Sequence, residues 1–172
     1  MNQFTFNLLV LNALLTTQEI YAMEKKKVEK TNVLSYSLST TLKTIADDCG
    51  QVSMDIEQKA KELGLEITGP QIWSYRGVDG NPDTRFNLDI CLPIKEAKGD
   101  PGIFKFNELP EINCLSEMHK GPWNQLSNTY MRMFGEMSRK GLIPNGANRE
   151  VYLNCDFENE ANNLTEVQIV VQ

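Results

Sequence analysis

Two acidic residues, Asp89 and Glu166, are the side chains best suited to specific chemistry, because each lies in an apolar stretch that alternates like a strand. A partly desolvated carboxylate favours a cationic partner, since the opposite charge offsets the cost of burying it. The two positions therefore predict a binding site for a cationic molecule. The alternative is that both are ordinary solvent-facing strand residues, because most Asp and Glu side chains are exposed.

Asp89 and Glu166 lie 77 positions apart, and the same offset recurs elsewhere in the chain. It relates three further features: Gly64-Leu65 to Gly141-Leu142, Gly69 to Gly146, and Tyr75 to Tyr152. An internal repeat of this kind predicts two copies of one unit that pack together, because neither copy buries its apolar face alone. Ligand sites tend to form in the cleft between such units.

Aromatic side chains supply candidate walls for that cleft: Trp73, Tyr75, Trp123, Tyr130, Phe134 and Tyr152. Each would add about 0.5–2 kcal/mol of cation–π attraction to a bound cation. Core packing is the alternative, since Tyr130 and Phe134 lie with Met137 on one stripe of an expected helix. Trp73 and Tyr75 share one strand face, and their pattern is equally compatible with a pocket and with a core.

The remaining reactive residue types predict neither a cofactor nor a metal site. The four cysteines are widely spaced and form no CxxC pair: Cys49, Cys91, Cys114 and Cys155. This spacing favours reduced, partly buried thiols over a disulfide framework or a zinc site. His119 is the only histidine and precedes a Gly-Pro turn, so we expect it to bond the backbone there. A catalytic role for His119 is the alternative.

Composition is typical of one globular domain. The chain has 172 residues, of which 41% are hydrophobic and 23% charged, and its formal net charge is −6. This acidic balance argues against direct binding to nucleic acid, because a DNA-binding surface needs basic residues to neutralise phosphates. The basic cluster Lys25–Lys27 is flanked by Glu24 and Glu29, so we expect a solvated segment there.

Residues 1–30 are expected to form an extension outside the domain. Their apolar run at residues 4–15 is too short for a membrane span. The run resembles the core of a signal peptide, with a poor cleavage site at Tyr21-Ala22, but no basic residue precedes it. Export is therefore the minor alternative to a cytoplasmic location, and Met23 is a second candidate start. The extension is too poorly patterned for a helix-turn-helix domain.

Hydrophobic periodicity and turn residues predict the order of elements. In a first unit at residues 31–95, we expect a strand at 32–45, a helix at 52–63, and strands at 71–76 and 86–94. Residues 96–110 carry Gly, Pro and charge, which is typical of a linker. A second unit at residues 111–172 repeats the order, with a strand at 112–118, a helix from Pro122 to Gly141, and strands at 149–155 and 164–171.

Each unit is thus strand–helix–strand–strand. Two such duplicated units predict an α+β fold with an antiparallel sheet, two packed helices and a central cleft. Alternation along the last strand places Val167, Ile169 and Val171 under the helices, and Glu166 on the opposite face toward the cleft. The same alternation turns Asp89 toward the cleft, so we expect both carboxylates on one concave surface.

Residues 32–171 contain several short motifs in a fixed order. They are Gly69-Pro70, Asp89-Ile90-Cys91-Leu92-Pro93-Ile94, His119-Lys120-Gly121-Pro122-Trp123, Gly141-Leu142 with Gly146, Arg149-Glu150-Val151-Tyr152 and Thr165-Glu166-Val167. This order resembles the GyrI-like (SOUL/GyrI-like) effector-binding domain, which also forms the ligand-binding half of some AraC-type and MerR-type regulators. Two features depart from the family. Residues 46–50 replace the His-x-Gly-Pro motif in the first unit, and the final strand lacks the usual proline.

The resemblance implies a cleft between the units that binds lipophilic, often cationic or aromatic, small molecules. It also implies a glutamate of the last strand deep in that cleft, which would be Glu166 here. The expected function is that of a stand-alone binding module for sensing or sequestration, which is not an enzyme and needs no cofactor.

Two alternatives to a binding module remain open. Some family members hydrolyse strained rings in reactive alkylating compounds, and Glu166 would then act as a general base with Tyr152 or Tyr75 as the acid. Others inhibit DNA gyrase, whose basic surface would attract an acidic protein. The expected partners are therefore a small-molecule ligand or, in the alternative, gyrase or a transcription regulator. Neither direct nucleic-acid binding nor a membrane span is expected.

Overall fold

The computed structural model describes residues 22–172 of the chain. The signal-like run at residues 4–15 lies outside the described residues, as does Tyr21 of the suggested cleavage site. Within the part that is described, no helix is both long enough and apolar enough to cross a membrane.

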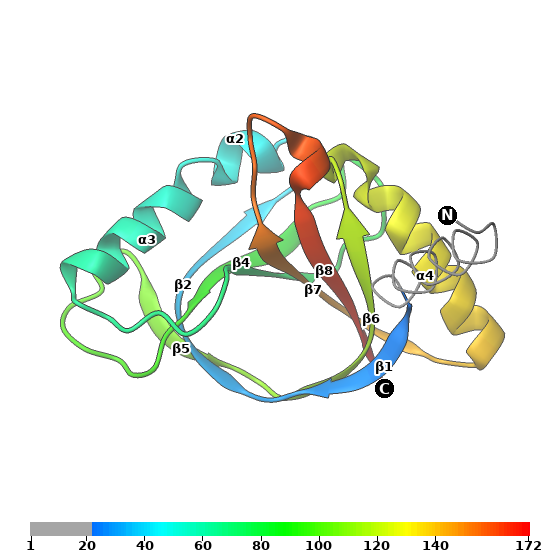
Figure 1. Ribbon diagram of the computed structural model, residues 1–172, viewed down its shortest axis with the longest axis horizontal. Coiled ribbons are helices and arrows are strands. Elements are labelled where there is room, and N and C mark those ends of the chain that lie inside the picture. The colour runs from blue at the N-terminus through cyan, green and yellow to red at the C-terminus, as the bar shows by residue number, and fades with distance from the viewer. Residues whose placement is uncertain (1–21) are drawn as a thin grey trace, which may run out of the picture.

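An eight-stranded antiparallel sheet forms the body of the molecule and curls into a half-barrel (Figure 1). The strands of the first unit are β2 (Thr31–Thr40), β3 (Ile72–Arg76) and β4 (Phe86–Pro93). Those of the second unit are β6 (Ile112–Lys120), β7 (Pro144–Asn154) and β8 (Leu164–Val171). The two ends of the sheet are β1 (Glu24–Val28) and β5 (Lys105–Leu109).

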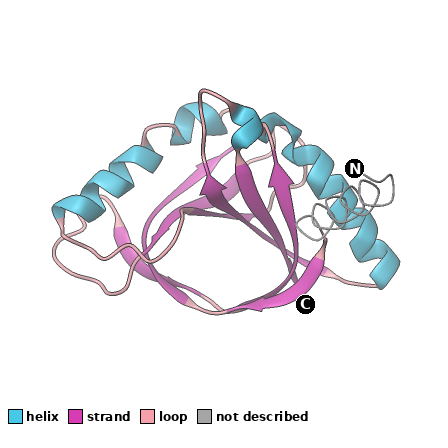
Figure 2. Cartoon of the chain, in the orientation of Figure 1, coloured by secondary structure: helices cyan, strands magenta, loops and turns pink. Residues whose placement is uncertain are grey.

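Helices cover the outer side of the curled sheet (Figure 2). The first unit contributes the short α2 (Ile45–Cys49) and α3 (Val52–Glu62). The second unit contributes a 3-10 turn η1 (Trp123–Gln125), α4 (Leu126–Lys140) and a second 3-10 turn η2 (Glu160–Asn162). We call the sheet face under α3 and α4 the helix face, and the opposite face the inner face.

The strand order β1-β6-β8-β7-β3-β4-β2-β5 relates the two units to each other. β3 and β7 pair at the centre, followed outward by β4 and β8, and then by β2 and β6. The predicted strand–helix–strand–strand order is thus present in both halves. The end strands are exchanged between the units, because β1 pairs with β6 of the second unit and β5 pairs with β2 of the first.

Two segments with irregular sequence patterns prove to be strands. The expected linker at 96–110 contains β5, and the basic cluster expected to be solvated forms β1. Backbone pairing at a sheet edge needs no apolar side chain, and Lys is common on edge strands. Two boundaries also differ from the prediction, since the first strand ends at Thr40 and β7 begins at Pro144.

The predicted alternation is confirmed on the helix face, where each long helix covers its own cluster. The cluster under α3 contains Leu34, Ile56, Ala60, Leu92, Ile94 and Phe104. The cluster under α4 contains Leu115, Met133, Met137, Val167, Ile169 and Val171. As predicted, Gly141 ends α4, with a left-handed φ of 65° that favours glycine. Apolar side chains of β2, β4, β6 and β8 therefore pack under the helices.

Candidate ligand-binding site

A buried carboxylate lies on the helix face where the two units meet. Glu150 of β7 is only 5% exposed. Its carboxylate accepts hydrogen bonds from the phenols of Tyr152 at 2.7 Å, Tyr75 at 2.8 Å and Tyr130 at 2.9 Å. Tyr75 belongs to the first unit, and the other three residues belong to the second. Both units therefore build this group.

The strand register explains why these side chains meet. β3 pairs with β7 so that Trp73 lies opposite Glu150. Residues directly opposite each other in an antiparallel pair share a face, and so do residues two apart on one strand. Tyr75 and Tyr152 therefore join Trp73 and Glu150 on the helix face, and Tyr130 reaches Glu150 from α4.

The electrostatics of the group keep its phenols neutral. Burial, reinforced by the neighbouring carboxylate, raises the pKa of Tyr75, Tyr130 and Tyr152 well above the ordinary phenol value. The phenols therefore stay protonated and remain donors. Across residues 22–172, Glu150 takes part in no ion pair. A buried carboxylate with hydrogen bonds but no cation is suited to a cationic ligand.

Aromatic rings continue from this group to the surface. Trp73 and Trp123 both contact Tyr152 edge-on, with ring centroids 5.3 and 5.6 Å away. Trp123 also contacts Phe157, a residue that is 81% exposed. The chain of rings provides faces for cation–π and stacking contacts between Glu150 and solvent.

The six aromatic residues singled out from the sequence thus gather around one carboxylate. Five of them are in the group just described, and Phe134 stacks on Tyr130 at a centroid distance of 6.4 Å. Whether they bind a ligand stays a prediction, but their proximity to one another is a structural fact.

Glu166 does not lie in this group, and the expected juxtaposition of Glu166 with the aromatic walls is wrong. As predicted, it points away from the helices, but the aromatic residues are on the helix face. Its carboxylate forms an ion pair with Lys26 of β1 and accepts a hydrogen bond from Ser116. Burial raises the pKa of Glu166, but the bonds from Lys26 and Ser116 outweigh burial and hold it below its ordinary value. Glu166 already has a cationic partner.

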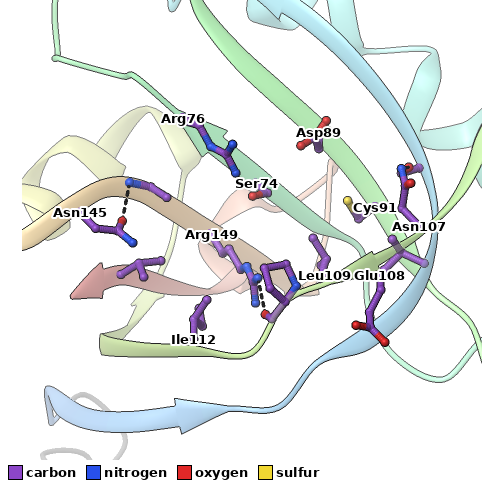
Figure 3. A pocket seen from close by; sticks show the side chains of 15 residues that line it. Ser74, Arg76, Asp89, Cys91, Asn107, Glu108, Leu109, Ile112, Asn145 and Arg149 are labelled. Atoms are coloured by element: carbon purple, nitrogen blue, oxygen red, sulfur yellow. Dashed lines mark hydrogen bonds between the residues drawn. The ribbon is translucent and has the colours of Figure 1, made fainter. Parts of the chain in front are cut away.

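Asp89 also lies on the inner face, away from the aromatic group. Its register partner on β3 is Ser74, and both line a cavity on that face together with Arg149 (Figure 3). The expected shared surface for Asp89 and Glu166 therefore exists only in the sense that both belong to the inner face. Neither carboxylate can meet a ligand that contacts the aromatic rings.

Glu150 is the residue that the sequence argument missed, although a signal for it was present. It stands two positions before Tyr152, so any strand that turns Tyr152 toward a cleft turns Glu150 there too. The repeat points instead to the carboxylates on the last strand of each unit, Asp89 and Glu166. Only the β3–β7 pairing reveals that Trp73 and Tyr75 share the face of Glu150.

The remaining candidate residues have structural roles. His119 contacts the Pro122 carbonyl oxygen through Nε2 at 3.1 Å, as expected, and Thr129 through Nδ1 at 2.9 Å. All four cysteines are free, and only Cys155 is exposed. Burial raises the pKa of the Cys91 thiol to about 12, so this group stays protonated and unreactive.

The fold and this site define a class of protein. In this class, two similar units meet under two helices, and polar and aromatic side chains from both units line the junction. The family model of the GyrI-like small molecule binding domain matches residues 21–172. The chain belongs to this family, as its motifs predicted. A sequence search of proteins with curated descriptions finds no match.

Solved structures have the same fold. The C-terminal domain of EcmrR superposes with a TM-score of 0.76 at 19% identity, covering 89% of this chain and 98% of that one. The longer EcmrR chain, solved in a complex with DNA, is covered over only 63% of its length.

Two further solved structures have the same fold. SAV2435 bound to tetraphenylphosphonium has a TM-score of 0.61 at 9% identity, covering 88% of this chain and 94% of that one. A hydrolase from Listeria innocua has a TM-score of 0.59 at 15% identity, covering 91% of this chain and 97% of that one. At such identities, the likeness establishes the fold alone.

Proposed function

We propose that this protein binds lipophilic cations at the group formed by Glu150, Tyr75, Tyr130 and Tyr152. One observation carries the proposal: a carboxylate that is 5% exposed has three phenolic donors and no basic partner within residues 22–172. A bound cation would supply the missing counter-charge, and the surrounding rings would supply its apolar contacts.

The family and its relatives support a small-molecule role. The matching family is described as a small molecule binding domain. A protein of the same fold was solved with tetraphenylphosphonium, a lipophilic cation of the kind proposed here. In this chain, the cation would approach past Phe157 and Trp123, because these rings extend the aromatic chain to solvent.

Calorimetric titration with tetraphenylphosphonium tests the proposal. We expect wild type to bind, and Glu150→Gln to bind at least about tenfold more weakly, since it loses the charge but keeps the shape. Glu166→Gln is the matched control, because it removes a buried carboxylate from the inner face. It should bind like wild type. Equal affinity of Glu150→Gln and wild type would overturn the proposal, as would loss of binding in Glu166→Gln alone.

The finer roles stay predictions. These roles are sensing, sequestration, and interaction with gyrase or a regulator, together with a cytoplasmic location. Hydrolysis also stays a prediction. If it occurs, the carboxylate beside the phenols of Tyr75 and Tyr152 is Glu150, so the general base would be Glu150 rather than Glu166.

A further inference from the structure

The inner face carries a second set of polar residues that the Glu150 site does not use. The register aligns Asp89 of β4, Ser74 of β3, Arg149 of β7 and Gln168 of β8 in one row across four neighbouring strands. Polar groups on a covered face are costly unless each finds a partner. Gln168 is 3% exposed, and its Oε1 has no hydrogen-bond partner among residues 22–172.

Arg149 is the charged centre of this row. It is 4% exposed and donates one hydrogen bond, from Nη2 to the Pro110 carbonyl oxygen at 2.8 Å. Burial lowers the pKa of its guanidinium from the ordinary value. No carboxylate within residues 22–172 forms an ion pair with Arg149. A guanidinium has five N–H donors, so Arg149 retains donors for a ligand.

A cavity of about 300 Å³ is lined by three residues of this row, Asp89, Ser74 and Arg149. Figure 3 shows Arg149 and Asp89 on either side of Ser74, with Arg76 beside them. Adjacent strands are about 4.8 Å apart, so Asp89 and Arg149, which are two strands apart, originate roughly 10 Å from each other. This separation leaves room for a small molecule between the two charges.

Asp89 also lacks a protein partner. It forms neither an ion pair nor a side-chain hydrogen bond with any other described residue, although Ser74 lies next to it in register and Arg149 lies one strand beyond Ser74. Glu108, the other acidic residue of the cavity wall, is paired with Lys30 at 3.0 Å. The cavity is therefore lined by the buried guanidinium of Arg149 and the partly buried carboxylate of Asp89, with the hydroxyl group of Ser74 between them.

We propose that this cavity is a second binding site, for a small zwitterion that carries a carboxylate and an ammonium group. Its carboxylate lies on the guanidinium of Arg149 in the two-pronged geometry that Arg favours, with the Ser74 hydroxyl as a further donor. Its ammonium group lies on Asp89. Arg76 is exposed and solvated, so it strengthens the field at the cavity without needing a partner of its own.

A series of ω-amino acids, from glycine to 6-aminohexanoate, tests the proposal by NMR titration and calorimetry. Wild type should bind at least one member at millimolar concentration, with shifts centred on the amides of Ser74, Asp89 and Arg149. The carboxylate and the alkylamine of matching length should each bind at least about tenfold more weakly, because each satisfies only one charge.

Arg149→Lys and Asp89→Asn separate the two ends of the ligand, and Glu150→Gln is the control. Arg149→Lys should lose at least about tenfold in affinity for the zwitterion, since an ammonium group lacks the two-pronged geometry. Asp89→Asn should bind the zwitterion no more tightly than it binds the plain carboxylate of matching length. Glu150→Gln should bind it like wild type, which makes this result independent of the lipophilic-cation site. Asp89→Asn and Ser74→Ala leave Arg149 intact, so they test the site even if Arg149→Lys fails to fold.

The proposal is overturned if no member of the series binds wild type at millimolar concentration. It is equally overturned if a bound member has the same affinity for Asp89→Asn and wild type, or if the shifts map to Tyr75, Tyr130 and Tyr152.

Discussion

Glu150 illustrates how a single buried charge sets the chemistry of its surroundings. Three phenols from two units converge on it, and their raised pKa keeps all of them as donors. A hydrogen bond to a charged group contributes about 1.5–3 kcal/mol, and removing one leaves part of the carboxylate unsatisfied. The group is therefore expected to stabilise the fold as well as to bind a ligand.

Replacing one phenol measures this contribution. We expect Tyr75→Phe to lower the free energy of unfolding by about 1.5–3 kcal/mol, because it removes a donor to Glu150 without opening a cavity. Tyr36→Phe is the control, since the Tyr36 side chain has no hydrogen bond to any residue the structure describes, and it should change stability by less than about 0.5 kcal/mol. Urea unfolding gives both values. Equal stability of the two variants would contradict the role given to the phenols.

Glu166 makes a separate, pH-dependent contribution on the inner face. Its pKa is below the ordinary value of 4.5 in the folded state, because the bonds from Lys26 and Ser116 outweigh the effect of burial. A lowered folded-state pKa gives stability that is present above pH 4.5 and is lost as the pH falls through the folded-state value.

Urea unfolding between pH 7 and about pH 3 tests this linkage. We expect Glu166→Gln to be less stable than wild type at pH 7, with the difference shrinking below pH 4.5. Glu158→Gln, on an exposed loop, should run parallel to wild type across the range. A pH-independent difference for Glu166→Gln would show that its ion pair with Lys26 is not what stabilises the fold.

At the scale of elements, α4 carries two glycines in opposite conformational situations. Gly141 ends the helix with φ of 65°, whereas Gly135 lies inside the helix with open space around the position of a Cβ atom. The first conformation strains any other residue, and the second penalises glycine itself. The same substitution should therefore have opposite effects at the two positions.

We expect Gly141→Ala to destabilise the protein by about 1–2 kcal/mol and Gly135→Ala to stabilise it by about 0.5–1 kcal/mol. Chemical denaturation of both variants against wild type measures the pair, and each serves as the control for the other. Stabilisation by Gly141→Ala would mean that α4 does not end at this residue in solution.

At the scale of the whole molecule, local patterns predicted each main element but not how the strands pair. Glycine turns and alternating side chains are sufficient to predict the two strand–helix–strand–strand units and to predict which residues of β8 lie on the helix face. The β3–β7 pairing joins residues far apart in the chain, and no local pattern encodes it. For that reason the six aromatic residues were found, but their carboxylate was assigned to Glu166 instead of Glu150.

The edge strands were missed for a related reason. β1 and β5 are rich in charge, and their regularity comes from backbone bonds to β6 and β2 rather than from side-chain burial. Lys26 would have been difficult to assign from sequence, because its partner Glu166 lies near the other end of the chain.

The exchange of β1 and β5 between the units affects how the chain folds during synthesis. β1 leaves the ribosome first, yet its hydrogen-bonding partner β6 follows only after the entire first unit, and β8 must still insert between β6 and β7. Until β7 is synthesised, β3 therefore has an unpaired edge, which becomes the centre of the complete sheet. An open strand edge can pair with another nascent chain, so the interval between synthesis of β3 and of β7 is when this edge favours intermolecular pairing.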